Sequence, residues 1–205
     1  FCYQRAVIHG RRDGDKARRQ LGLNLRGPWL LVTGSVGTGK TTLSKRLAVA
    51  LTNARAGSRR WRHLEVSRLV RERQLYQEWD DELGASVFDE EMLERELCKE
   101  LAGTNGTVVD FHSASCFPDD VGNPVAVYVL RAETSTIYDR LTGRGYPARK
   151  ITENVECEIF GTVAEEVNEV WGSERVVIEE LRNDSEADQE ANVKKIIEAT
   201  RRSCP

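Results

Sequence analysis

Residues 34–41 read Gly34-Ser35-Val36-Gly37-Thr38-Gly39-Lys40-Thr41, a complete GxxxxGK[ST] motif, and Thr42 follows it. Residues 29–33 before the motif form an almost wholly apolar run, which is typical of a buried strand. Residues 40–54 after it carry apolar side chains at helical spacing. A strand, a glycine-rich loop and a helix in this order form the phosphate-binding loop, or P-loop. The sequence therefore predicts that the chain binds a nucleoside triphosphate.

Each position of the motif has a chemical reason. Glycine residues let the backbone direct successive N–H groups at one anion. The N-terminus of the following helix adds the positive end of its dipole. We expect Lys40 to reach the β- and γ-phosphates of the nucleotide, and the Thr41 hydroxyl to bind Mg²⁺. A nucleoside triphosphate and Mg²⁺ are thus the expected ligands of the loop.

Strands and helices alternate beyond the motif. Further strands are predicted at residues 62–66, 107–110, 125–130 and 176–178. Helical spacing marks residues 67–75, 89–101, 134–142, 152–170 and 186–202. This alternation predicts an α/β fold with a parallel sheet of about five strands flanked by helices.

The length and composition fit one P-loop domain, at residues 28–205, behind a basic extension. Hydrophobic residues make up 40% of the 205 residues, and the net charge of -3 argues against a surface built to cover nucleic acid. Residues 1–26 carry seven Lys or Arg against two Asp. We expect residues 1–27 to be a flexible arm that contacts RNA phosphates, or a solvated extension with no partner.

The cysteines and the hydropathy of the sequence indicate in which cellular compartment the protein is expected. The five cysteines include no CxxC pair, so neither a zinc site nor a disulfide framework is indicated. No apolar stretch is long enough to cross a bilayer, and the N-terminus has no apolar signal core. The expectation is an intracellular protein with no membrane partner.

Two arginine-bearing segments narrow the class of P-loop protein. The Asn-Lys-x-Asp segment that reads guanine in GTPases is missing from the sequence. Small phosphotransferases instead place arginines around the moving phosphoryl group, because the guanidinium fork matches phosphate oxygens. The candidates here are Arg68, Arg71 and Arg73 in one segment and Arg144, Arg149 and Lys150 in the other.

Four segments together resemble the adenylate kinase isoenzyme 6 family. They are the P-loop, residues 69–76 (LVRERQLY), residues 108–112 (VVDFH) with Phe117-Pro118, and residues 144–146 (RGY) running into residues 152–160 (TENVECEIF). The last is the most distinctive, because a generic P-loop kinase has no reason to carry an NxxCEIF helix. The resemblance extends from residue 29 to about residue 202.

The resemblance implies a nucleoside monophosphate kinase fold with strand order 2-3-1-4-5 and a short lid. It implies the reaction of ATP with AMP to give two ADP, together with ATP hydrolysis. It also implies a small-subunit ribosomal protein and the pre-ribosome as partners in late 18S rRNA maturation, with nuclear and cytoplasmic locations.

The family's functional residues fall on named positions. Its nucleotide-binding residues match Gly37, Gly39, Lys40, Thr41, Thr42 and, in the lid, Arg144. Arg71 matches an arginine for the acceptor phosphate. The monophosphate-binding region corresponds to residues 65–88 and the lid to residues 143–153.

The Asp110-x-His112 pair supplies the other catalytic candidates beside Lys40 and Arg144. Asp110 ends a predicted buried strand, where it can hold the water shell of Mg²⁺. His112 projects to the same side of an extended chain, where it can position water or relay a proton; a purely structural histidine is the alternative. The D-x-H arrangement is typical of the family.

Two other functions stay open. One is a ribosome assembly factor that hydrolyses NTP and phosphorylates AMP only incidentally. The other is a small-metabolite kinase of the shikimate type, which shares the size and the P-loop. The glycine triplet that helps such enzymes hold a small acid is missing from the sequence, which counts against it.

Overall fold

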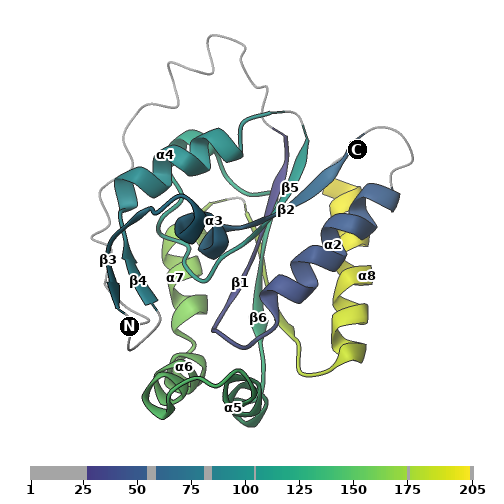
Figure 1. Ribbon diagram of the computed structural model, residues 1–205. Coiled ribbons are helices and arrows are strands. Elements are labelled where there is room, and N and C mark those ends of the chain that lie inside the picture. Colours follow the sequence, from purple (N-terminus) through teal and green to yellow (C-terminus); the bar gives the residue numbers. More distant parts are fainter. Residues whose placement is uncertain (1–26, 55–58, 81–84, 104, 175, 204–205) are drawn as a thin grey trace.

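The computed structural model describes residues 27–54, 59–80, 85–103, 105–174 and 176–203. A five-stranded sheet crosses the centre of the molecule (Figure 1). Its strands are β1 (Trp29–Gly34), β2 (Trp61–Glu65), β5 (Gly106–Asp110), β6 (Ala126–Arg131) and β7 (Val177–Arg182), and all neighbouring pairs are parallel. The order across the sheet is β2-β5-β1-β6-β7. This is 2-3-1-4-5 in chain order, so the expected fold is confirmed. The basic arm, residues 1–26, lies outside the described residues.

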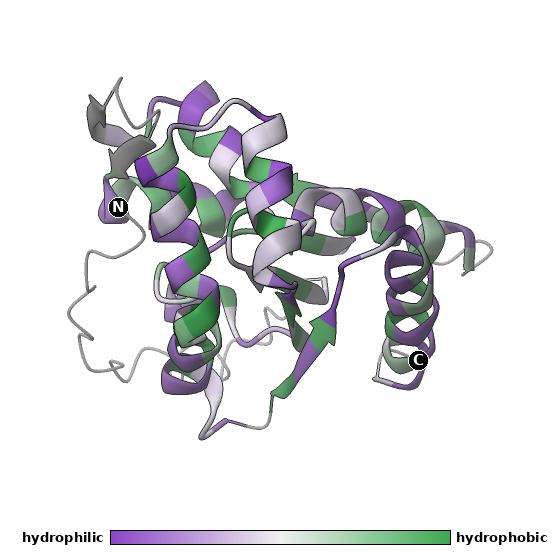
Figure 2. Cartoon of the chain, turned by 90° about the horizontal axis from the view of Figure 1, so that it is seen from below, coloured by the Kyte–Doolittle hydropathy of each residue, from purple (hydrophilic) through white to green (hydrophobic). Residues whose placement is uncertain are grey.

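Helices cover both faces of the sheet. On one side lie α2 (Lys40–Ala54) and α8 (Glu186–Ser203). On the other lie α3 (Val66–Glu72), α4 (Glu90–Glu100) and α7 (Thr162–Trp171), with a short 3-10 turn, η1 (Asp119–Val121). The pair α5 (Thr134–Gly143) and α6 (Ala148–Phe160) lies near the end of β1 that leads into the P-loop (Figure 1). Figure 2 shows green and purple residues alternating along these helices, the amphipathic pattern of a covering layer.

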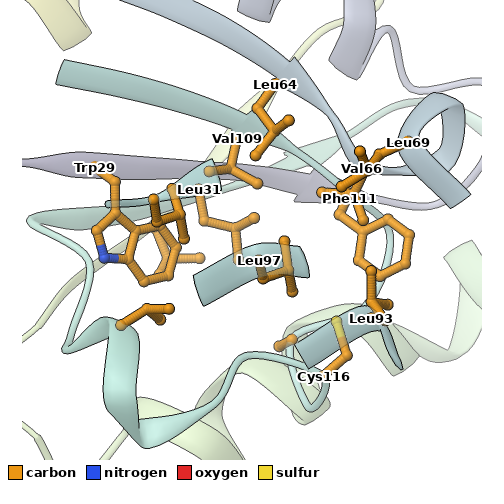
Figure 3. Close-up of a cluster of buried hydrophobic side chains, with 14 of the residues drawn as sticks. Trp29, Leu31, Leu64, Val66, Leu69, Leu93, Leu97, Val109, Phe111 and Cys116 are labelled. Atoms are coloured by element: carbon orange, nitrogen blue, oxygen red, sulfur yellow. The ribbon is translucent and has the colours of Figure 1, made fainter. Parts of the chain in front are cut away.

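Two hydrophobic layers hold the sheet. Alternate residues of β1 point to opposite faces, so Leu31 packs in one layer and Leu30 in the other. The first layer joins Leu31 and Val109 to Leu93 and Leu97 of α4 (Figure 3). Every residue of β1 is buried, as the apolar run before the P-loop predicts. The P-loop therefore starts from a strand that is buried along its whole length.

The segment after β2 differs from its prediction. The predicted helix at residues 67–75 ends at Glu72, and Gln74 takes a positive φ of 54°. An antiparallel hairpin follows, made of β3 (Tyr76–Asp80) and β4 (Ala85–Phe88). Leu75 is buried and its N–H donates to the Val70 carbonyl at 2.9 Å, which turns the chain out of the helix.

The single helix predicted at residues 152–170 is wrong. Two helices, α6 and α7, meet at Gly161, which has a φ of 66°. This left-handed conformation ends a helix, and glycine adopts it without the cost that a Cβ brings. The first helix also begins earlier than predicted, at Ala148. Within the described residues, no helix has the length and apolar character to span a bilayer.

Candidate active site

The P-loop connects β1 to α2 through a tight internal turn. The Thr38 hydroxyl donates to the Ser35 carbonyl at 2.8 Å. Gly37 and Gly39 take φ angles of 98° and 94°, in the region that favours glycine. At Gly39 a side chain would also collide, because a Cβ there would lie 2.6 Å from Nδ2 of Asn183. The loop shape therefore requires the glycines that the motif contains.

Lys40 and the two threonines open α2. The Lys40 ammonium donates to the carbonyl oxygens of Gly34 at 2.8 Å and Ser35 at 3.0 Å, so it lies over the loop. Thr41 is half-buried and Thr42 is exposed, both in the first turn of the helix. N–H groups at a helix N-terminus point toward an anion bound there. These positions suit a triphosphate.

Asp110 is the last residue of β5 and pairs with Val32, two residues before the P-loop. It is buried, and its Oδ2 lies 3.4 Å from Nε2 of His63 on β2. Neither atom forms a hydrogen bond with the described residues. His63 was missed in the sequence, because only the register of the parallel strands brings it diagonally opposite Asp110.

The residues present fit a magnesium ion. Oδ2 of Asp110 is buried without a hydrogen bond to any described residue, at the end of the parallel strands where the P-loop begins. A water of the Mg²⁺ shell would supply that hydrogen bond. Thr41 offers a hydroxyl from the loop's other end. In the described part of the chain no three His, Cys, Asp or Glu side chains gather as a metal site. Mg²⁺ needs no such cage where phosphates and waters supply its ligands.

His112 lies beside the same groups. Burial is the largest cause that lowers its pKa, the Lys40 ammonium lowers it as well, and the Asp110 carboxylate opposes both; together they bring the pKa from the ordinary value of 6.5 to about 4. The imidazole ring contacts Phe111, with ring centroids 4.4 Å apart. His112 is therefore neutral at physiological pH, and one ring nitrogen can accept a hydrogen bond.

The lowered pKa predicts how stability depends on pH. As the pH falls from 6.5 towards 4, the unfolded chain binds a proton at this imidazole while the folded protein does not, so the folded state loses stability. Between pH 6.5 and pH 5 we expect the free energy of unfolding of His112→Gln to fall by about 1.5 kcal/mol less than that of the wild type. Urea denaturation without nucleotide at the two pH values measures this. Equal losses in both proteins would contradict the shift.

Arg140, which sequence reasoning missed, joins the P-loop to the β7–α8 turn. Its guanidinium donates to the Gly37 carbonyl at 2.9 Å, to Asn183 O at 3.2 Å and to Asp184 O at 2.6 Å. The buried amide of Asn183 in turn donates to the Thr38 carbonyl at 2.7 Å. The loop is thus held by groups more than a hundred positions away in sequence. The one sequence feature that could have pointed to Arg140 is its position one helical turn before Arg144, a predicted site residue.

Glu158, also missed, joins α6 to the P-loop. Its carboxylate is buried and accepts hydrogen bonds from the Ser35 hydroxyl at 2.7 Å, Nε of Arg131 at 2.7 Å and the Ala132 N–H at 3.1 Å. Desolvation acts against the Arg131 charge, but Glu158 and Glu180 outweigh it, so the pKa of Arg131 is raised. The distinctive NxxCEIF helix therefore supplies a structural carboxylate to the nucleotide loop.

Arg71 and Arg144 are not brought to the loop. Arg71 lies on α3 and Arg144 follows α5, and both side chains are exposed. Neither forms a hydrogen bond or ion pair through its side chain with any residue that the structure describes. In enzymes whose segments close over the substrate, arginines outside the loop reach a phosphate only on closure. Their assignment to the acceptor and to the moving phosphoryl group stays a prediction.

Comparisons with known proteins agree with this geometry. The family described as "AAA domain" matches residues 30–161. A shikimate kinase from Bacteroides thetaiotaomicron has a similar structure, with a TM-score of 0.53 and 17% identity over 85% of this chain and 98% of that one. At this identity the likeness concerns the fold alone, and it confirms the P-loop kinase fold.

Relatives of higher sequence identity indicate the family as well as the fold. An adenylate kinase isoenzyme 6 homolog of Caenorhabditis elegans is 40% identical over 84% of this chain and 89% of its own length. The homolog of Drosophila melanogaster is 32% identical over 82% of this chain and 89% of its own length. A putative adenylate kinase of Saccharolobus islandicus is 34% identical over 69% of each chain. The resemblance in the four sequence segments is therefore confirmed, and the chain belongs to the adenylate kinase isoenzyme 6 family of nucleotide kinases.

Proposed function

We propose that this protein transfers the γ-phosphoryl group of Mg²⁺-ATP to AMP, forming two ADP, and hydrolyses ATP as a slower reaction. The observation that carries the proposal is the position of Lys40, Asp110 and His112 at one end of the sheet, around a glycine loop shaped for phosphate. The names of the relatives in two animals support the choice of nucleotides.

Each residue has a role in this scheme. Lys40 neutralises the β- and γ-phosphates, and the amides at the start of α2 bind the same oxygens. Asp110 and Thr41 would hold Mg²⁺, which when bound neutralises charge on the phosphate oxygens. Arg71 binds the acceptor phosphate, and Arg144 moves onto the transferring group as its segment closes. No strong base is needed, because positioning and charge neutralisation supply most of the rate.

The neutral His112 ring has its role in hydrolysis. A ring nitrogen that accepts a hydrogen bond can orient a water toward the γ-phosphate. In AMP phosphorylation the acceptor is already a nucleophile held by its own contacts. Loss of His112 should therefore affect ATP hydrolysis more than AMP phosphorylation.

The acceptor is tested by ADP formation from Mg²⁺-ATP. AMP, CMP, GMP, UMP and shikimate are added singly to the purified protein. AMP is expected to raise the rate at least about tenfold above hydrolysis alone, since proximity of a bound acceptor outcompetes water. Acceleration by shikimate would contradict the proposal. A slow rate indifferent to all five acceptors would favour the assembly factor over the metabolic kinase.

The cellular role is proposed on the four sequence segments. The protein would act in the nucleus and cytoplasm, with a small-subunit ribosomal protein and the pre-ribosome, and residues 1–26 would contact rRNA. One feature that suits a protein partner is the pair Ile159 and Phe160 on α6, which are 60% and 71% exposed. Co-sedimentation with pre-ribosomal particles tests the role.

A further inference from the structure

One carboxylate oxygen anchors the loop that follows β5. Oε1 of Glu166 accepts a hydrogen bond from the Ser113 hydroxyl at 2.7 Å, from the Ala114 N–H at 3.0 Å and from the Ser115 N–H at 3.0 Å. The donors belong to three successive residues. Hydrogen bonds to a charged acceptor are roughly twice as strong as neutral ones. Residues 113–115 are therefore all held by hydrogen bonds to one atom, Oε1 of Glu166.

That atom belongs to a rigid element. Glu166 lies on α7, whose Val163, Val167 and Trp171 are buried in the core between this helix and the sheet. The Trp171 ring packs on Trp29 of β1, with centroids 6.2 Å apart. The Glu166 backbone thus has a fixed position relative to the strand that leads into the P-loop.

His112 lies between two fixed points. On one side the Phe111 N–H donates to the Val32 carbonyl at 3.3 Å, and the Phe111 ring is buried. On the other side Ser113 begins the segment bound to Glu166. The backbone around His112 therefore has little freedom left, and the direction of its ring depends on both attachments.

We propose that Glu166 is a positioning residue for His112, holding residues 113–115 so that the imidazole stays beside Lys40 and Asp110. The consequence for turnover rests on the proposed function, in which His112 orients the water of ATP hydrolysis. A displacement of about 1 Å in a catalytic group costs up to about a hundredfold in rate. Loss of the anchor should therefore lower the rate and leave ATP binding unchanged.

The first measurement is kinetic. Glu166→Ala is expected to lower kcat for ATP hydrolysis about tenfold and leave KM for ATP within about twofold. Glu166→Gln should keep at least about half of kcat, because its amide oxygen can accept the same three bonds. Glu165→Ala is the matched control, since Glu165 is the exposed neighbour on the same helix. Loss of activity in the Gln variant equal to that in the Ala variant would overturn the proposal.

The second measurement observes His112 directly. The ring signals of His112 in a carbon–proton NMR spectrum, recorded at pH 7.5 without nucleotide, should move and broaden in Glu166→Ala and stay in place in Glu166→Gln. Unchanged signals in Glu166→Ala would overturn the positioning role. If Glu166→Ala does not fold, Ser113→Ala, which removes the shortest of the three bonds, should give a smaller shift in the same direction, and no shift would likewise overturn it.

A double variant separates this inference from the proposed function. In a His112→Gly background, Glu166→Ala should reduce hydrolysis by less than about twofold further, because the residue it positions is gone. A full tenfold loss in that background would overturn the inference. If the NMR signals move in Glu166→Ala but neither it nor His112→Gly slows hydrolysis, the positioning holds and the proposed role of His112 in hydrolysis fails.

Discussion

Lys40→Ala is expected to reduce phosphoryl transfer about a thousandfold while the protein stays folded. In the structure the ammonium lies over the P-loop and donates to two of its carbonyl oxygens. A cation at this point neutralises charge that develops on the phosphates, and removing one such group costs on the order of 10²–10³ in rate. The hydrogen bonds from Lys40 to the Gly34 and Ser35 carbonyls are only partly buried. Their loss should therefore lower the free energy of unfolding little.

The measurement is ADP formation at saturating ATP and AMP, with thermal denaturation followed by circular dichroism. Lys45→Ala is the matched control, because Lys45 lies on the same helix with an exposed side chain. The control should keep the wild-type rate within about twofold. Retained turnover in Lys40→Ala, with the control also active, would remove the P-loop as the site of catalysis.

The second large effect is expected from Glu158→Ala, on stability. The substitution leaves the partly buried Arg131 guanidinium without its main partner and the buried Ser35 hydroxyl without its acceptor. Breaking one side of a buried ion pair costs about 3–5 kcal/mol. Arg131 keeps its contact with Glu180 and is 30% exposed, which places the expected loss at about 3 kcal/mol, the lower end.

Urea denaturation at neutral pH measures this loss. Glu156→Ala controls for changes in helix propensity, because Glu156 is exposed on the same helix, and it should change stability by less than about 0.5 kcal/mol. Glu158→Gln keeps an acceptor for Ser35 but removes the charge. Its loss of stability should therefore lie between those of Glu156→Ala and Glu158→Ala. A Glu158→Ala variant as stable as the control would show that the buried pair contributes nothing to the fold.

Local patterns were sufficient for most of the sheet and its covering helices. The buried run at β1 and the helix α2 that begins at Lys40 follow the prediction closely, because the apolar periodicity is unbroken there. The hairpin β3–β4 was missed, since its formation depends on Tyr76 and Phe88 packing against the core and on the Phe88 ring contacting Phe111. Its strands have 5 and 4 residues, too short for a clear alternation of their own.

The break between α6 and α7 shows the same limit. A glycine within a helical pattern is compatible with a continuous helix, and nothing near Gly161 in the sequence specifies its left-handed conformation. In the folded chain, α6 must turn Glu158 toward the P-loop while α7 turns Val163 and Val167 into the core. These contacts exist only in the tertiary structure, so the helical periodicity alone does not indicate the break.

From the sequence alone follow the P-loop, its lysine and the fold class, because eight consecutive residues contain the whole phosphate motif and the flanking periodicity identifies its strand and helix. Only the tertiary structure shows what holds that motif in place. Arg140 and Glu158 reach it across sequence separations of 103 and 123, and Asn183 across 145. Such contacts depend on strand register and helix packing, and these are decided by the burial of the whole core rather than by any local pattern.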